Sequence, residues 1–317
     1  MRRTMTDVIL IILGLLVLWV GTELVIGDAV KIAHRYGLSE LFVGLVVLSI
    51  GSDLPEVAVA INSGIRTLQG VDVSGVVVGS SIGSAFGQIG LVLGIAGLAG
   101  YLVVPRPYVY RHGAVLLGSI VLLAAVGWNG VVTRAEGLFL ILVFAGYMIF
   151  AYREEKGRAA EHRTESGKMG LAWLGLAVGM VLVIGSSDIT VNAATHLAER
   201  WGVAQTLVAI ILIGIGTSLP ELTISLGALL KKKAGMSVGN IIGSNILDTL
   251  VPIGLAATIS NLSFDVSMLR FDLPALFLLS LIALVFFIVE RGLQKWEAVI
   301  ILSLYFIYIV LKIKYFA

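Results

Sequence analysis

Blocks of about 20 apolar residues recur along the whole chain, and an α-helix of this length crosses the hydrocarbon core of a bilayer. Hydrophobic residues make up 58% of the 317 residues, whereas charged residues make up only 13%. A soluble domain carries roughly 25% charged residues. A membrane β-barrel would show alternating segments of about ten residues instead. The sequence therefore predicts an all-α polytopic membrane protein.

Ten segments are apolar enough to span a membrane, and one polar stretch divides them five and five. The spans are expected at residues 8–27, 40–63, 73–100, 112–128, 135–152, 169–195, 204–230, 236–258, 271–290 and 295–312. The polar stretch, residues 153–168, is interpreted as a solvated linker. We therefore expect a first unit at residues 1–152 and a second at residues 169–317.

The two units share a pattern of small, proline and acidic residues. Three residues recur 165 positions later: Gly51, Pro55 and Glu56 correspond to Gly216, Pro220 and Glu221. With an offset of 160, Ser84 and Gln88 correspond to Ser244 and Asp248. A duplicated unit with an odd number of spans inserts its second copy upside down. The pattern predicts two inverted five-helix repeats, related by an axis in the membrane plane.

A proline interrupts the second span and another interrupts the seventh. Pro55 lacks an N–H group and its ring crowds the preceding turn, while Gly51 loosens the backbone just before it. We expect the helix to unwind or kink at residues 49–55, which would free the carbonyl oxygen of Ser49. The seventh span has the same features at Gly214, Gly216 and Pro220.

Oxygen-bearing side chains gather at both breaks. They are Ser52, Asp53, Glu56, Thr217, Ser218 and Glu221. Because hydrocarbon penalises charge and open backbone, such features persist in a span only where they line a site. Hard oxygen ligands suit Ca²⁺, Mg²⁺ or Na⁺, and they offer neither nitrogen nor sulfur for zinc or copper. The chain has no cysteine, and we expect a transported cation rather than a cofactor.

The third and eighth spans are expected to supply the remaining walls of the site. Ser84 with Gln88, and Ser244 with Asp248, are four residues apart and therefore share a helix face. Each pair presents two oxygens in one direction, and we expect Gln88 and Asp248 among them to serve as ligands of the ion. Glycines in the same spans are interpreted as sites of close helix packing: Gly79, Gly83, Gly239 and Gly243.

These segments resemble the two α-repeats of the Ca²⁺/cation antiporter superfamily, and especially its Na⁺/Ca²⁺ exchanger branch. The stretches that carry the resemblance are Gly216 to Glu221 and Gly239 to Asp248. The resemblance implies that Glu56 and Glu221 are the main Ca²⁺ carboxylates, and that Gln88 and Asp248 are paired near the centre. It implies hydroxyl or carbonyl ligands for Na⁺ from Ser52, Thr217, Ser218, Ser84 and Ser244. The implied mechanism is alternating access, with the first and sixth spans sliding across the core.

The first repeat departs from the family pattern at three positions. Asp53 stands where the exchangers usually have Ser, Gln88 where they have Asn, and Ser80 where Asn is common. Asp53 adds a fourth carboxyl group to the site, and four carboxylates around one cation do not all ionise cheaply. A proton or a further cation would then balance the charge. Ca²⁺/H⁺ exchange and K⁺-dependent Na⁺/Ca²⁺ exchange therefore stay open as alternatives.

The Lys and Arg residues are distributed unevenly between the two sides of the membrane. The side with the linker, residues 153–168, holds 14 of the 22 Lys and Arg residues. The excess predicts that the linker is cytoplasmic and that both termini lie outside a cell membrane. The expected partners are the lipid bilayer, Ca²⁺ and Na⁺, with H⁺ or K⁺ as the alternative coupling ions. The formal charge of +2 gives no reason to expect a nucleic acid, and the sequence leaves the oligomeric state open.

Two other classes of protein also place polar groups inside a membrane. An intramembrane aspartyl protease needs two neighbouring Asp residues with separated pKa values, whereas the carboxylates repeated here are Glu56 and Glu221. Channels usually build their pores from symmetric subunits or filter loops. An inverted repeat within one chain favours a secondary antiporter over either an enzyme or a channel.

Overall fold

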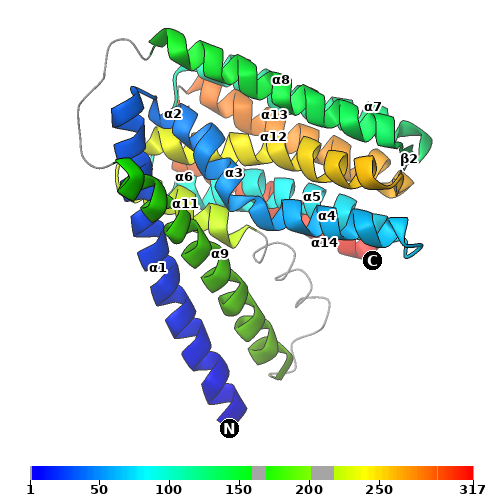
Figure 1. The fold of residues 1–317 in the computed structure, drawn as a ribbon, viewed down its shortest axis with the longest axis horizontal. Coiled ribbons are helices and arrows are strands. Elements are labelled where there is room, and N and C mark those ends of the chain that lie inside the picture. The colour runs from blue at the N-terminus through cyan, green and yellow to red at the C-terminus, as the bar shows by residue number, and fades with distance from the viewer. Residues whose placement is uncertain (1, 159–168, 201–217, 291, 317) are drawn as a thin grey trace.

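The computed structural model describes residues 2–158, 169–200, 218–290 and 292–316, and nearly all of them are helical (Figure 1). The helices are α1 (Arg2–Tyr36), α2 (Glu40–Phe42), η1 (Val43–Leu48), α3 (Ser49–Ser52), α4 (Leu54–Leu68), α5 (Ser74–Phe86), η2 (Gly87–Val92), α6 (Leu93–Ala99), α7 (Arg106–Val126), η3 (Gly127–Asn129), α8 (Arg134–Arg158), α9 (Met169–Arg200), α11 (Leu219–Leu230), α12 (Ala234–Ile259), η6 (Met268–Asp272), α13 (Leu273–Val289) and α14 (Lys295–Phe316). The strands are β1 (Leu102–Val103), β2 (Val131–Val132), β3 (Leu262–Ser263) and β4 (Gly292–Leu293).

Within these described ranges, eight helices are long and apolar enough to cross a membrane, and a bent pair formed by Glu40–Ser52 and Leu54–Leu68 raises the number to nine. The polytopic helical class predicted from the sequence is therefore confirmed. The expected seventh span lies partly outside the described residues, which include only α11 from it. The number ten and the inverted arrangement stay predictions.

The first helix is longer than its apolar block. We expected the span to end at residue 27, with Asp28 in a loop, but α1 continues to Tyr36. Asp28 is buried, and its carboxylate pairs with Lys31 Nζ at 2.6 Å, one turn further along the helix. Helix propensity and this ion pair let α1 continue beyond the apolar segment.

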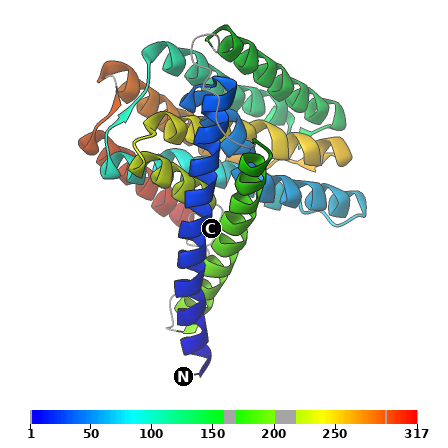
Figure 2. The same ribbon diagram turned by 60° about the vertical axis from the view of Figure 1, so that its left-hand side comes forward.

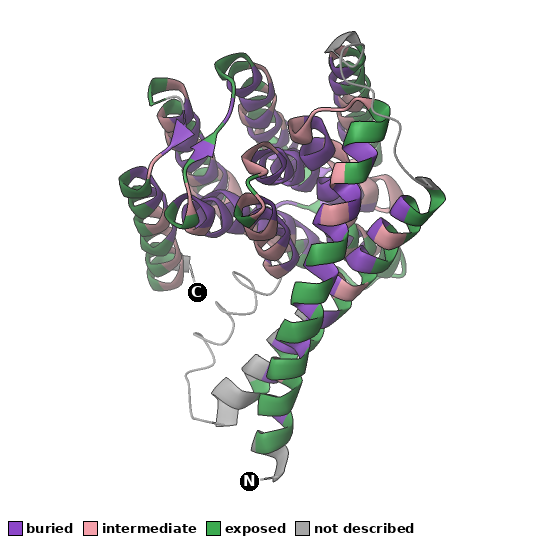
Figure 3. Cartoon of the chain, turned by 90° about the vertical axis from the view of Figure 1, so that its left-hand side faces the viewer, coloured by how far each residue is buried: buried purple, intermediate pink, exposed green. Residues whose placement is uncertain are grey.

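The two long helices α1 and α9 lie side by side and project from the rest of the bundle (Figures 1 and 2). A Cβ atom on Gly179 would lie 3.0 Å from the carbonyl oxygen of Gly21, and one on Gly21 would lie 3.1 Å from that of Gly179. A second hydrophobic cluster, separate from the main core, includes Ile26 of α1 and Met180 of α9, and it joins the pair to η1, α11 and α12 through Val43, Ile224 and Met236. Much of the N-terminal half of α1 is exposed (Figure 3).

Helix α12 lies in the middle of the remaining helices, where it contacts α4, α5, α7, α8 and α11. Its most apolar stretch is 83% buried, against 22% for α8 and for α14. Glycines make this central position possible: a Cβ atom on Gly239 would lie 2.3 Å from the Leu41 carbonyl oxygen, and one on Gly243 would lie 2.2 Å from that of Leu45. The predicted close packing is confirmed at both glycines.

Gly79 behaves differently from the glycines of α12. The nearest described atom to a Cβ built there is Met268 Cε, at 3.7 Å, which is ordinary contact. The close packing predicted for Gly79 is therefore not found among the described residues. By the repeat, the expected neighbour of Gly79 is the segment 204–217, all of which lies outside the described ranges.

Short strands connect the two parts of the chain. Strand β1 pairs antiparallel with β4, with Leu102 opposite Leu293. Strand β2 pairs antiparallel with β3, with Val131 opposite Ser263. Each two-stranded sheet therefore joins one strand that precedes the polar stretch to one strand that follows it.

Candidate cation site

Span two is interrupted at a single residue, Asp53, which lies between α3 and α4. Its backbone (φ −88°, ψ 7°) leaves the helical region, Pro55 sits in the first turn of α4, and the two parts of the span meet at 46°. The break predicted at residues 49–55 is confirmed. Ser218 has similar angles (φ −102°, ψ 4°) before α11, which carries Pro220 in its first turn. The other expected break residues, Gly214, Gly216 and Thr217, lie outside the described residues.

The carbonyl of Ser49 is not freed by this break, so that prediction is wrong. The Ser49 oxygen accepts the Asp53 N–H at 3.0 Å and the Ser52 hydroxyl at 3.2 Å. The Ser49 hydroxyl in turn donates to the Leu45 carbonyl at 2.5 Å. Because Pro55 removes a hydrogen bond only at its own position, helical bonding continues for a turn longer than we expected.

Four carboxyl groups from different segments converge in the interior of the bundle. Asp53, Glu56, Glu221 and Asp248 are each at most 5% exposed. Asp53 interacts electrostatically with Glu56 and Glu221, and Asp248 interacts with Asp53 and Glu56. The start of α4, the start of α11 and the middle of α12 thus bring together the acidic side chains that the sequence singled out.

An amide bridge positions one of these carboxyl groups. Gln88 lies in η2, and its Nε2 donates to Asp248 Oδ2 at 2.9 Å and to the Ser84 hydroxyl at 3.3 Å. Its Oε1 accepts from Asn245 Nδ2 at 2.9 Å, and Asn245 also donates to the Ala85 carbonyl at 2.8 Å. We expected Gln88 to offer its oxygen to an ion, but here that oxygen already accepts a hydrogen bond, and the side chain orients Asp248.

Asn245 is a site residue that our treatment of the sequence did not select. It lies within the stretch Gly239 to Asp248 that carries the family resemblance, and it is fully buried. An amide in the middle of an apolar span is the signal that would have found it.

Several oxygens around the carboxyl cluster lack hydrogen-bond donors from the described part of the chain. They are Asp53 Oδ2, Glu56 Oε2, both Glu221 carboxyl oxygens, Asp248 Oδ1, and the hydroxyl oxygens of Ser218 and Ser244. Buried polar atoms in native proteins are nearly always paired, because leaving them unpaired is costly. Carboxylate and hydroxyl oxygens without donors are what a hard cation coordinates.

The described side chains do not form a closed metal cluster. Across these residues, no three Asp, Glu or His side chains stand close enough together to hold one metal ion by themselves. A bound cation would therefore combine carboxylates with hydroxyl oxygens such as those of Ser218 and Ser244, which is the mixed donor set that Ca²⁺ and Na⁺ accept.

The sequence model of the family described as sodium/calcium exchanger protein matches residues 6–153 and 171–314. The chain belongs to this family. Its members are transporters rather than enzymes, and this chain is a multi-pass membrane protein of that class. The resemblance found in the α-repeat segments is thereby confirmed.

Individual relatives align over most of the chain. Sodium/calcium exchanger MaX1 of Methanosarcina acetivorans is 25% identical, over 95% of this chain and 97% of its own length. Inner membrane protein YrbG of Escherichia coli is 28% identical, over 86% of each chain. The fold superposes with a TM-score of 0.82 on a structure of the sodium-calcium exchanger NCX_Mj soaked with Na⁺ and Sr²⁺, which is 25% identical and matches over 99% of both chains.

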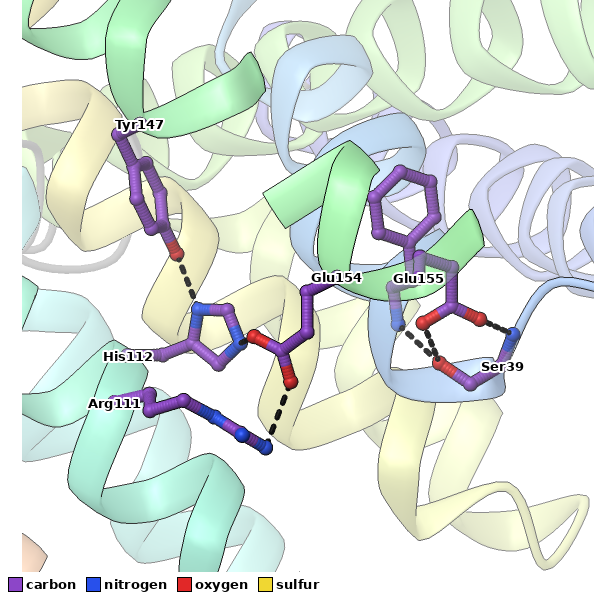
Figure 4. Close-up of polar contacts among 7 residues, drawn as sticks. Ser39, Arg111, His112, Tyr147, Glu154 and Glu155 are labelled. Carbon is purple, nitrogen blue, oxygen red and sulfur yellow. Dashed lines mark hydrogen bonds and ion pairs between the residues drawn. The ribbon is translucent and has the colours of Figure 1, made fainter. Parts of the chain in front are cut away.

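In this exchanger-family chain, a carboxylate at the end of α8 caps the start of span two (Figure 4). Glu155 accepts hydrogen bonds from the Ser39 N–H and, at 2.9 Å, from the Ser39 hydroxyl, whose oxygen accepts from the Phe42 N–H at 3.2 Å. The polar stretch was interpreted as a solvated linker from residue 153 onward. Its first residues instead continue α8 to Arg158, and Glu155 is only 5% exposed.

A second polar group joins α7 to the same end of α8 (Figure 4). Arg111 Nη2 lies 2.7 Å from Glu154 Oε1, and His112 Nδ1 lies 2.8 Å from the Tyr147 hydroxyl. Arg111 and Glu154 lie just outside the expected spans 112–128 and 135–152, and the sequence pattern indicated no contact between them. They anchor the helix that carries Glu155, and so help to fix where span two begins.

Proposed function

We propose that this chain is a secondary antiporter that exchanges Na⁺ for Ca²⁺ by alternating access, with the ions bound near the middle of the membrane. The observation that carries the proposal is that Asp53, Glu56, Glu221 and Asp248 are buried, interact electrostatically, and have carboxyl oxygens without a hydrogen-bond partner among the described residues. The name of the relative MaX1, sodium/calcium exchanger, supports the same pair of ions.

The packing of α1 against α9 supports an inverted repeat. A Cβ atom on Gly14 would contact the backbone of Ser186, and a Cβ atom on Gly179 would contact that of Gly21. An offset of 165 converts the first contact into the second. The two strand pairs are exchanged in the same way, since β1 corresponds to β3 and β2 to β4. Such exchanged contacts are expected from a two-fold axis between the halves.

Transport in proteoliposomes tests the proposal. Vesicles loaded with Na⁺ and diluted into Na⁺-free buffer should take up radioactive Ca²⁺ without a pH gradient, and Glu221→Gln should reduce the uptake by at least about ten-fold. Glu23→Gln is the matched control, because Glu23 is half-exposed on α1 and pairs with Lys231 at 2.8 Å. The proposal would be contradicted by Ca²⁺ uptake that does not depend on the Na⁺ gradient. It would also be contradicted if Glu221→Gln and Glu23→Gln reduced the uptake equally.

Asp53 favours a second candidate, in which H⁺ or K⁺ takes part in the exchange. Asp53 is fully buried beside Glu56 and Glu221, so its charge needs a balancing cation. Asp53→Ser restores the residue usual in the resembled exchangers. Under this candidate, the substitution flattens the dependence of Ca²⁺ uptake on pH between 6 and 9, or removes its dependence on K⁺. Unchanged profiles would exclude a part for Asp53 in coupling.

A further inference from the structure

Two polar helix faces extend beyond the carboxyl cluster toward one end of the bundle. Residues three and four apart share a helix face. On α11 they are Glu221 and Ser225, with Ser218 just before the helix, and on α12 they are Ser237, Asn240, Ser244 and Asp248. The two helices pack against each other. The second half therefore carries a column of polar groups between them that is longer than the cluster itself.

The far end of this column contains three fully buried residues, Ser225, Ser237 and Asn240, each with 0% exposure. Asn240 Nδ2 donates to the Ser225 hydroxyl at 3.1 Å and so joins α12 to α11. Asn240 Oδ1 and Ser237 Oγ are buried without any hydrogen-bond partner in the described ranges. Because buried oxygens are nearly always paired, fully buried oxygens without a partner indicate that a ligand binds there.

The position of these oxygens follows from helix geometry. Ser225 is four residues beyond Glu221 on α11, and Asn240 is four residues before Ser244 on α12, which places them about 6 Å along the helix axes from the cluster. Both helices then run to the loop at residues 231–233. The three oxygens therefore lie between the carboxyl cluster and this loop, on the side that the sequence predicts to be cytoplasmic.

The first half of the chain does not repeat this feature. With the offsets of the internal repeat, Ser225 corresponds to Ala60, Ser237 to Val77 and Asn240 to Ser80. Two of the three polar side chains thus have apolar counterparts. Ser80 keeps a hydroxyl oxygen, but the duplicated fold does not itself require oxygens at the positions of Ser225 and Ser237, so these two indicate a property specific to the second half.

We propose that Ser225, Ser237 and Asn240 form a transit site for Na⁺ between the central carboxylates and the loop at residues 231–233. The donors are neutral hydroxyl and amide oxygens. Ca²⁺ sites in proteins depend on carboxylate ligands, whereas a monovalent hard cation is less costly to desolvate and needs no charged ligand of its own. The site would give Na⁺ partial coordination as it moves to or from the cluster. This inference rests on the proposed Na⁺/Ca²⁺ exchange.

The test compares two modes of transport in one double variant, Ser225→Ala with Asn240→Leu. Removing both hydrogen-bond partners together avoids leaving either one buried and unpaired. In proteoliposomes, the Na⁺ concentration for half-maximal Ca²⁺ uptake should rise at least about five-fold, since the loss of one neutral ligand already gives about this factor and the variant lacks two. Na⁺-free exchange of Ca²⁺ for Ca²⁺ should change far less.

The matched control is Ser119→Ala. Ser119 on α7 accepts the Thr249 hydroxyl at 2.8 Å, so this variant also loses a buried bond to α12, but away from the polar column. It should leave the Na⁺ dependence unchanged. If the double variant loses both transport modes in proportion, or if its Na⁺ dependence matches that of the control, the three residues have only a structural function and the inference is overturned.

A binding measurement separates this inference from the proposed exchange. In detergent, replacing choline with Na⁺ should raise the melting temperature of the wild-type chain more than that of the double variant. If the wild type shows no Na⁺-driven Ca²⁺ uptake, the exchange proposal fails, but a smaller Na⁺ stabilisation in the double variant would still support a Na⁺ site. Equal stabilisation of both proteins would overturn the site.

Discussion

A disulfide between α1 and α11 should lock the chain in one state if α1 slides during transport. A Cβ atom on Gly227 would lie 3.9 Å from Thr22 Cβ, within the range of about 3.5–4.5 Å that a disulfide requires. Sliding of α1 by one helical turn, about 5.4 Å, would increase this separation to roughly 6.7 Å and make the bond impossible. The chain has no cysteine of its own, so Thr22→Cys with Gly227→Cys introduces the only pair.

Oxidation of this double variant should reduce Na⁺-driven Ca²⁺ uptake in proportion to the cross-linked fraction, and a reductant should restore it. The control is Gly14→Cys with Thr190→Cys, where a Cβ atom on Gly14 would lie 3.3 Å from Thr190 Cβ, just below that range, so that a small outward shift allows the bond. That bond joins α1 to α9, which we expect to move together, so uptake should persist. Full uptake by the cross-linked Thr22–Gly227 variant would refute sliding of α1 past α11.

Two further predictions concern packing and the start of span two. Gly243→Ala should lower the melting temperature, because its Cβ would lie 2.2 Å from the Leu45 carbonyl oxygen, and overpacking costs about 1–3 kcal/mol. Gly118→Ala, at an exposed position where no described atom lies within 4 Å of the added Cβ, should not lower it. Glu155→Ala removes the acceptor of both Ser39 groups and should cost about 0.5–2 kcal/mol in thermal unfolding. A neutral Glu155→Ala variant would show that the cap does not fix this end of the span.

The sequence predicted the spans well because hydrocarbon imposes a length on any apolar helix. The expected 236–258 became α12 (Ala234–Ile259), and the expected 73–100 became α5 through α6, ending at Ala99. Asp53 was selected because a carboxylate beside a proline is rare in such a span, and the structure places it at the bend. These features depend on hydropathy, helix length and proline within one segment, and not on contacts with the rest of the chain.

Other features depended on partners that lie far away in the chain. Glu155 is part of a polar run that reads as a linker, and only its contact with Ser39, 116 positions away, shows that it caps another helix. The π-helical segments η1 and η2 have no local signal, since one extra residue in a helical turn leaves the hydropathy unchanged. Segment η2 carries Gln88, and its contact with Asp248 depends on the packing of separate spans.

Asp53 combines two features that bear on the central proposal. It occupies the N-cap position of α4, where an Asp side chain usually accepts a backbone N–H and contributes about 1 kcal/mol, yet its carboxylate makes no such bond. It faces Glu56 and Glu221 instead, which repel it. A carboxylate that makes no cap and lies beside two like charges is destabilising unless a proton or a cation balances its charge.

Asp53→Asn should therefore change the melting temperature differently in the absence and in the presence of ions. In the absence of Ca²⁺ and Na⁺, the substitution removes like-charge repulsion and should raise the melting temperature. With saturating Ca²⁺, the wild type should gain more stability than the variant, because the variant lacks one anionic neighbour for the ion. If Asp53→Asn lowers the melting temperature without ions and leaves the Ca²⁺-induced increase intact, Asp53 stabilises the fold itself, and the argument that its charge is balanced by a transported cation fails.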